Sequence, residues 1–290
     1  MIATFSFNFA LSLVLGQSMD ILWSAVENLQ VVQLTQMLDV KTPGSVAKYL
    51  DYFDEVTSVE IFDTEVISEK LMYIPDVDSF SLNFQQAGYY TWLFLANAQG
   101  FLLALLMHFS LVFVFLALYA FERRYPKLKS KRKKLRNYLF WQVSIQLFME
   151  SYLDIAMFSF MNISEIVWIK GCSGVRASNV LAYIFVILVS AAPLFLAGFA
   201  FWRRQKWKKS SFKKRYGSLL EGIKTDKDNA FLVITTSLTF FSRRLILSLT
   251  LIYMQNFFWG QIAIQLMIST LLMIFLQWFK PLYPNMSNHL

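Results

Sequence analysis

Two adjacent arginines, Arg243 and Arg244, lie in the middle of the long apolar stretch "TFFSRRLILSL". One arginine at the centre of a membrane helix costs about 3 kcal/mol on insertion scales, so a pair of them needs neutralising groups nearby. Two carboxylates, Glu150 and Asp154, lie inside another apolar segment and carry the same cost. We therefore predict an intramembrane charged cluster formed by these four residues.

The predicted cluster depends on matched depth in the membrane. Counted from the basic end of each segment, Glu150 and Asp154 lie about 12 and 16 residues deep, and Arg243 and Arg244 lie about 14 and 15 residues deep. At a rise of about 1.5 Å per residue, the four side chains are therefore within a few ångströms of one another in height. The cluster has two interpretations. It is a buried salt bridge that locks the helices together, or it is a gating or ion-coordinating element.

Polar residues extend this charged centre along three helices. Gln142 and Gln146 precede Glu150 and Asp154 at intervals of four residues, which places all four on one helix face. Such stripes line an aqueous pathway or form interhelical hydrogen bonds in a dry bundle. The lining candidates on the last two apolar segments are Thr236, Thr239, Gln261, Gln265 and Ser269.

The elements that must position these residues are membrane helices. Of the 290 residues, 56% are hydrophobic and 17% aromatic, and the mean hydropathy is +0.45, which is more apolar than a soluble domain. The predicted fold is all-α, a polytopic transmembrane helical bundle of about six spans, each near the 20 residues that cross a bilayer. The predicted spans are 1–38, 90–121, 138–161, 179–202, 229–254 and 261–279.

Basic residues are concentrated in two loops, 121–137 and 203–228, which hold 19 of the 27 Lys and Arg residues. Short loops rich in Lys and Arg remain cytoplasmic, so both loops are predicted on that side, in contact with anionic lipid headgroups. Calmodulin is the alternative partner of loop 203–228, and nucleic acid is excluded because no soluble reader domain is present. The predicted lipid contacts are Arg123, Arg124, Lys131, Arg132, Lys133, Lys134, Arg203, Arg204, Lys208 and Lys209.

The opposite side of the membrane is predicted to carry the acidic segment 39–89 and the loop 162–178, both extracytoplasmic. The acidic segment is a solvated cap, or a vestibule that attracts cations. The N-terminal segment 1–38 is a first membrane helix with an amphipathic extension, a signal peptide, or the truncated start of a longer chain. The remaining domain, 90–290, is predicted to be a five-span membrane domain.

Enzyme chemistry is not expected from these residues. The chain has two histidines, so no histidine-based metal site forms, and we predict no catalytic residues, metal or cofactor. The predicted function is a channel-like protein of the plasma membrane with cation permeation, assembled as a homo-oligomer. The alternative is a non-conducting receptor, anchor or scaffold whose buried ion pairs are structural.

Several short segments carry a family resemblance: "QSMDILWSAVENLQVVQLTQMLDV", "FMESYLDIAMFSFMNI", "KKRYGSLLEGIK" and "FFSRRLILSLTLIY". They resemble the multi-pass C-terminal membrane region of large ciliate surface proteins. That region is distantly similar to transient-receptor-potential-like membrane domains. The resemblance implies a helical membrane domain and a channel-like function. This chain lacks the cysteine-rich extracellular modules of that family.

Overall fold

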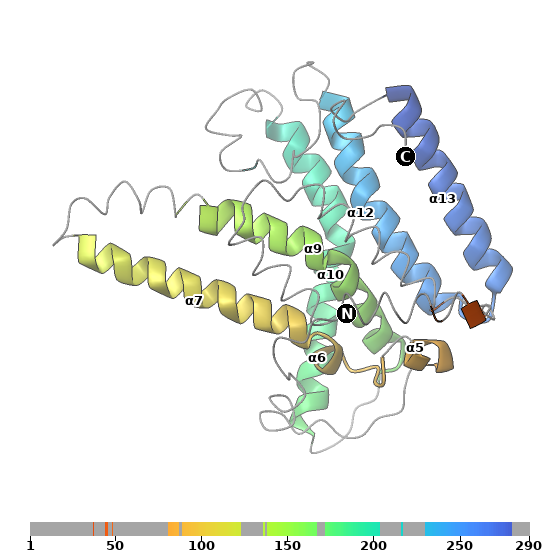
Figure 1. The fold of residues 1–290 in the computed structure, drawn as a ribbon, viewed down its shortest axis with the longest axis horizontal. Helices are drawn as coiled ribbons and strands as arrows, with labels where there is room; N and C mark the ends of the chain where they lie inside the picture. Colours follow the sequence, from red (N-terminus) through yellow and green to blue (C-terminus); the bar gives the residue numbers. More distant parts are fainter. Residues whose placement is uncertain are drawn as a thin grey trace.

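The computed structural model describes residues 37, 44–45, 48, 81–86, 89–122, 136, 138–166, 172–203, 216 and 230–279. The predictions for most of 1–89 and for the bulk of both basic loops lie outside these residues. Every regular element in the described part is helical (Figure 1). The elements are α5 (Leu82–Gln86), α6 (Phe94–Asn97), α7 (Gln99–Glu122), the π-helical turn η3 (Tyr138–Val143), α9 (Ser144–Ser164), α10 (Ser173–Arg203), α12 (Ala230–Tyr253) and α13 (Phe258–Phe279).

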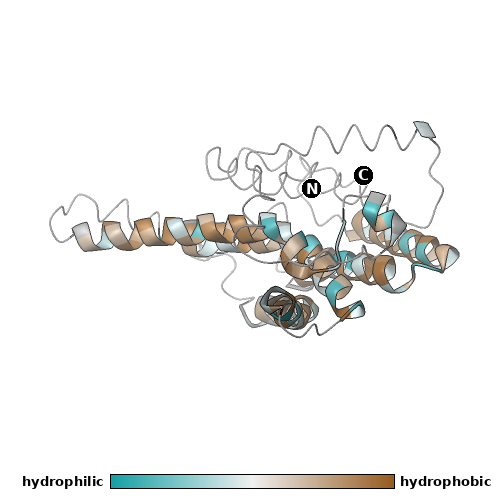
Figure 2. Cartoon of the chain, turned by 90° about the horizontal axis from the view of Figure 1, so that it is seen from below, coloured by the Kyte–Doolittle hydropathy of each residue, from teal (hydrophilic) through white to brown (hydrophobic). Residues whose placement is uncertain are grey.

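Three of the described helices are long and apolar enough to cross a membrane: α7, α10 and α13, over Gln99–Ala120, Ser173–Phe199 and Phe258–Phe279. Hydrophobic residues predominate on the surfaces of the long helices (Figure 2). The helical membrane class predicted from the sequence is confirmed to this extent. The two other long helices, α9 and α12, have lower hydropathy; α9 contains Glu150 and Asp154, and α12 contains Arg243 and Arg244.

The most polar stretch of α9 is also the most completely buried. Each of the twelve residues from 151 to 162 is buried, and α9 packs against both α10 and α12. A helix with charged residues at membrane depth is stable where protein surrounds it, because lipid cannot hydrogen-bond to polar groups. Because protein surrounds this part of α9, the helix can contain polar residues that lipid would not satisfy.

Aromatic side chains join α9 to its neighbours. The ring of Tyr152 meets the ring of Phe241 on α12 edge to face, with centroids 4.8 Å apart, and both side chains are almost fully buried. Other ring pairs join α10 to the elements before α9: the Phe185 ring of α10 stacks on Phe94 of α6 at 5.2 Å and meets the edge of Phe101 of α7 at 5.7 Å. Edge-to-face and offset pairs of this kind add about 0.5–1.5 kcal/mol each beyond the area they bury.

Helix α10 contains a proline, Pro193, within its 31 residues. Proline has no backbone N–H, so the carbonyl four residues earlier, that of Val189, loses its usual intrahelical donor. The Tyr152 hydroxyl of α9 donates a hydrogen bond to this same carbonyl oxygen at 3.0 Å. A neighbouring helix thus replaces the hydrogen bond that the proline removes, as membrane proteins require.

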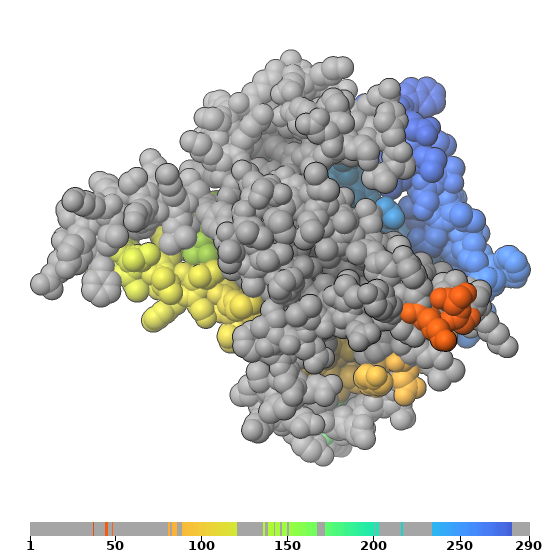
Figure 3. All heavy atoms as spheres, in the orientation of Figure 1, coloured from red at the N-terminus to blue at the C-terminus, as the bar shows by residue number. Residues whose placement is uncertain are grey.

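The outer helices make fewer contacts. Helices α12 and α13 form the tight antiparallel hairpin expected from the short "QNFFWG" connection, and α13 lies along α12 (Figure 1). Helix α7 touches α6, η3 and α9, and its Phe101 ring meets Phe185 of α10. Helices α7 and α13 lie at opposite edges of the molecule (Figure 3). The two helices have broad exposed apolar surfaces, and Phe113 and Trp278 are 74% and 80% exposed.

The helix boundaries differ from the prediction in three places. The predicted span 90–121 is divided into the short helix α6 and helix α7, which begins at Gln99. Helix α10 begins at Ser173, six residues before the predicted start, because the polar residues Ser178 and Asn179 are buried and hydrogen-bonded inside the protein. The predicted loop 162–178 therefore contains the end of α9 and the first turns of α10. The predicted third span begins with η3, a π-helical turn, before it continues as α9.

Candidate functional site: the charged centre between α9 and α12

Arg244 is directed from α12 toward α9. Its Nη1 donates a 2.8 Å hydrogen bond to the backbone carbonyl of Met149, and its guanidinium lies 4.0 Å from the centroid of the Phe240 ring. The side chain is only 5% exposed. A desolvated cation over an aromatic face gains about 2 kcal/mol or more. The contact joins Arg244 to α9 at Met149, about four residues nearer the basic end of α9 than the equal-depth position 153.

The salt bridge predicted between Asp154 and the arginine pair is not formed. Asp154 is 8% exposed, and among the described residues its Oδ1 has no hydrogen-bond partner. The reason is position along α9: Arg244 engages the carbonyl of Met149, five residues before Asp154, which corresponds to about 7.5 Å of helix rise.

The other members of the predicted cluster are less well defined. Arg243 is half-buried, beside Arg244 on α12. The side chains of Glu150, Gln142 and Gln146 lie outside the described part, so their predicted roles remain predictions. Gln142 lies in η3, where a four-residue interval no longer defines one face as it does in a regular α-helix.

Two of the predicted lining residues take part in interhelical hydrogen bonds. Gln265 on α13 donates from Nε2 to the Thr250 hydroxyl oxygen of α12 at 2.8 Å. Gln261 donates from Nε2 to the Thr250 carbonyl at 3.3 Å, although its Oε1 finds no partner in the described residues. These contacts join the two arms of the hairpin, so this stripe follows the dry-bundle alternative.

The remaining lining candidates are Thr236 and Thr239 on α12 and Ser269 on α13. The Thr239 hydroxyl bonds back to the Thr235 carbonyl of its own helix at 2.7 Å. Thr236 is half-buried on α12, and Ser269 is exposed on α13. These positions are therefore not brought together with the charged centre by any interaction described here.

A buried polar cluster escaped the sequence analysis. Asn162 accepts at Oδ1 from the Phe94 backbone N–H at 3.2 Å and from the Ser178 hydroxyl at 2.8 Å, and its Nδ2 donates to Asn179 Oδ1 at 2.9 Å. Ser178 Oγ in turn accepts from the Leu95 N–H at 3.2 Å. The cluster joins the end of α9 to the start of α10 and satisfies the first amides of α6. Isolated Asn and Ser residues in apolar runs gave no pattern that would have revealed it.

A histidine contact was also not predicted. The Ser144 hydroxyl of α9 lies 3.2 Å from Nε2 of His108 on α7, and His108 is 8% exposed. Its Nδ1 has no hydrogen-bond partner among the described residues. In that same part of the chain, no group of three His, Cys, Asp or Glu side chains is arranged to hold a metal ion.

The residues that flank the two basic loops lie at the same end of the helices. The Trp141 ring, just after loop 121–137, meets the ring of Tyr216 from loop 203–228 at a centroid distance of 4.9 Å. Tyr216 also lies 5.1 Å from Phe199, near the end of α10. The side of the membrane on which the two basic loops lie stays a prediction. The ten predicted lipid-contact side chains lie outside the described part.

Comparison with known proteins assigns neither a family nor a function to the chain. No protein-family model, curated protein or solved structure matches the chain.

Proposed function

We propose that the chain is an integral membrane protein that conducts cations, with Asp154 in its charge-selecting centre. The observation that carries this proposal is the buried Asp154 carboxylate, whose Oδ1 has no hydrogen-bond partner in the described residues. A carboxylate inside a membrane helix is costly, and such groups typically mark ion or proton pathways. A second buried oxygen on α9, Ser159 Oγ, likewise lacks a partner there.

In this proposal the chain crosses the bilayer about six times, because α9 and α12 are also near the 20 residues that span the hydrocarbon. Both contain polar residues that require protein contacts, and both belong to the packed centre. The basic loops are cytoplasmic, the acidic segment 39–89 faces outward, and copies of the chain assemble around the conducting path. The plasma membrane is the proposed location.

The test is cation flux through liposomes that contain the purified protein. We expect Asp154→Asn to change the rate or the cation-to-anion selectivity, because it removes the buried charge while it keeps the side-chain shape. Glu165→Gln is the matched control, because it makes the same chemical change at the exposed end of the same helix. A double variant, Glu150→Gln with Asp154→Asn, tests both carboxylates of the predicted cluster.

The alternative is a non-conducting anchor or scaffold, and one observation favours it. The amides of Gln261 and Gln265 are engaged with Thr250 in the α12–α13 hairpin and so contribute to helix association. Well-folded wild-type protein that passes no cations over a range of voltage and calcium would support this alternative. Flux that is identical in wild type and Asp154→Asn would remove Asp154 from the conducting path.

A further inference from the structure

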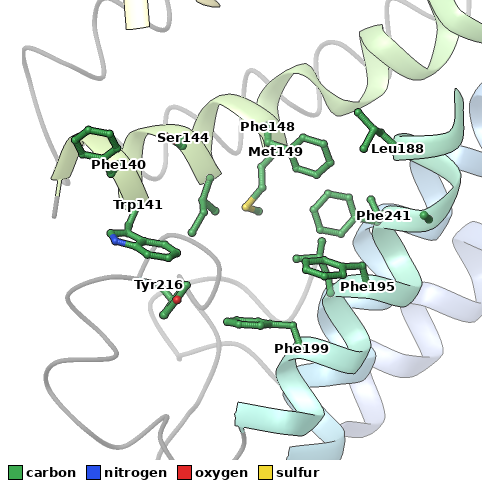
Figure 4. A pocket seen from close by; sticks show the side chains of 14 residues that line it. Phe140, Trp141, Ser144, Phe148, Met149, Leu188, Phe195, Phe199, Tyr216 and Phe241 are labelled. Atoms are coloured by element: carbon green, nitrogen blue, oxygen red, sulfur yellow. The ribbon is translucent and has the colours of Figure 1, made fainter. Parts of the chain in front are cut away.

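A large apolar pocket lies between η3, α9, α10 and α12, at the end of the helices that carries the basic loops. Its volume is about 680 Å³, within the range of about 300–1,000 Å³ typical of small-molecule sites. Aromatic rings from several elements surround the space (Figure 4). The lining residues are Phe140, Trp141, Ser144, Ile145, Phe148, Met149, Leu188, Ala191, Ala192, Phe195, Leu196, Phe199, Tyr216 and Phe241.

The lining of this pocket matches a hydrocarbon ligand. Among its fourteen residues, the only side-chain hydroxyls are those of Ser144 and Tyr216. The Ser144 hydroxyl already contacts His108 and the Leu139 carbonyl. A polar ligand would lose hydration there and regain few hydrogen bonds, whereas a hydrocarbon chain loses nothing of this kind.

The pocket is accessible from the lipid side. Two of its lining residues on α10, Leu188 and Phe195, are 50% and 70% exposed, so the wall that they form meets the surrounding hydrocarbon. A chain from the bilayer can therefore enter sideways between the helices. Entry of this kind does not require the ligand to leave the membrane.

Charge at the pocket's edge selects the headgroup. Tyr216 belongs to loop 203–228 and is preceded by Lys213, Lys214 and Arg215 in the sequence, while Trp141 closely follows the basic loop 121–137. The two ring centroids lie 4.9 Å apart, so positions 141 and 216 meet at the edge of the pocket. Basic residues beside a pocket between membrane helices favour anionic headgroups.

We propose that this pocket binds an acyl chain of an anionic phospholipid from the cytoplasmic leaflet, whose headgroup is held by Lys and Arg residues of the two basic loops. The site is separate from the charged centre at Asp154 and does not depend on conduction. Because the Tyr216 ring meets both Trp141 and Phe199 at the edge of the pocket, a bound chain also contacts η3, α9 and α10. The lipid is then a structural ligand of the cytoplasmic end.

The experiment uses the full chain in phosphatidylcholine nanodiscs that contain a small fraction of phosphatidylserine with a photoreactive diazirine in one acyl chain. After irradiation, labelled peptides are identified by mass spectrometry. We expect labelling of residues 138–149 and 188–199, and about fivefold less labelling by a phosphatidylcholine probe with the same chain, the ratio expected for about one basic contact. Equal labelling by both probes would overturn the selection of anionic lipid.

Pocket-filling variants test where the chain binds. Ala191→Trp fills the space from α10, and we expect it to lower labelling of 138–149 at least fivefold. Leu194→Trp is the matched control, because Leu194 lies on the same helix, is 74% exposed and does not line the pocket. Ile145→Trp fills the same space from α9, so misfolding of one variant leaves the other as the test. Labelling that survives in the folded filling variants would overturn the proposal.

A variant with fewer positive charges separates the contribution of the lipid headgroup from that of the acyl chain. Replacing Lys213, Lys214 and Arg215 by glutamine should reduce the phosphatidylserine signal toward the phosphatidylcholine level and leave the phosphatidylcholine signal unchanged. Retention of the full preference for phosphatidylserine would show that the loop 203–228 does not select the headgroup. Because these measurements read binding directly, they are independent of whether the protein passes ions.

Discussion

The hydrogen bond from Tyr152 to the Val189 carbonyl leads to a quantitative prediction. Tyr152→Phe removes the hydroxyl and leaves a buried carbonyl that cannot recover an intrahelical partner, because residue 193 is proline. Both Tyr152 and Val189 are 0% exposed, so water does not replace the lost donor. An unsatisfied buried acceptor costs about 1–3 kcal/mol. Hydrogen bonds between membrane helices average about 0.6 kcal/mol with a maximum near 1.7 kcal/mol.

We expect the loss to lie at the upper end of the membrane range, about 1–2 kcal/mol, which is a 5- to 30-fold change in the folded-to-unfolded ratio. The decisive comparison is a double-mutant cycle with Pro193→Ala, which restores a backbone N–H at the correct position. In that background Tyr152→Phe should cost less than about 0.5 kcal/mol, because the Val189 carbonyl regains its helical donor.

The measurement is SDS-induced unfolding in mixed micelles, followed by far-UV circular dichroism. Tyr183→Phe is the matched control on α10, because Tyr183 is 46% exposed and its hydroxyl makes no hydrogen bond described here. This control should leave the unfolding midpoint unchanged. If Tyr152→Phe costs the same amount with proline and with alanine at position 193, the hydroxyl does not act as a substitute donor and the reasoning is refuted.

Three further outcomes follow from described contacts. Arg244→Leu should destabilise the fold by about 3 kcal/mol, because it removes a charged hydrogen bond and a cation–π contact. The neighbouring variant Arg243→Leu should cost much less. Equal SDS-unfolding midpoints for the two variants would contradict this order. Asn162→Leu should cost about 2–4 kcal/mol, because it leaves the Phe94 N–H and the Ser178 hydroxyl without their buried acceptor. Amide hydrogen exchange should then be faster at the start of α6. Unchanged protection there would contradict the role of the cluster. Thr250→Val should weaken the α12–α13 hairpin by about 0.6–1.7 kcal/mol, which thermal unfolding of the variant would detect.

The sequence predicted the helical elements well because hydropathy alone defines them. The five described long helices coincide with predicted apolar segments, and α12 and α13 end within a few residues of the expected positions. The short connection after Tyr253 required a hairpin, and the structure has one. The orientation of α7 was not predictable, because a helix that is apolar on all sides has no face that specifies a neighbour.

The site was predicted less completely, for a physical reason. Depth along two helices indicated that Arg244 meets α9, but depth does not distinguish a carboxylate from a backbone carbonyl as its partner. The hydrogen bonds of Asn162 depend on how three segments meet in space, and no sequence interval encodes that meeting. Likewise, the π-helical turn at 138–143 follows from local backbone geometry that the apolar pattern does not define.

The Asn162 cluster constrains the order in which the protein assembles during synthesis. Its hydrogen bonds join residues that are 68 and 83 positions apart, so the amides of Phe94 and Leu95 wait for partners that the ribosome makes much later. The Phe94 N–H gains its acceptor once Asn162 of α9 is in place, whereas the Leu95 N–H gains its acceptor only when α10 has been inserted. Completion of α10 therefore marks the point at which the early helices become fixed, and a nascent chain that stops before residue 178 lacks the oxygen that accepts from Leu95.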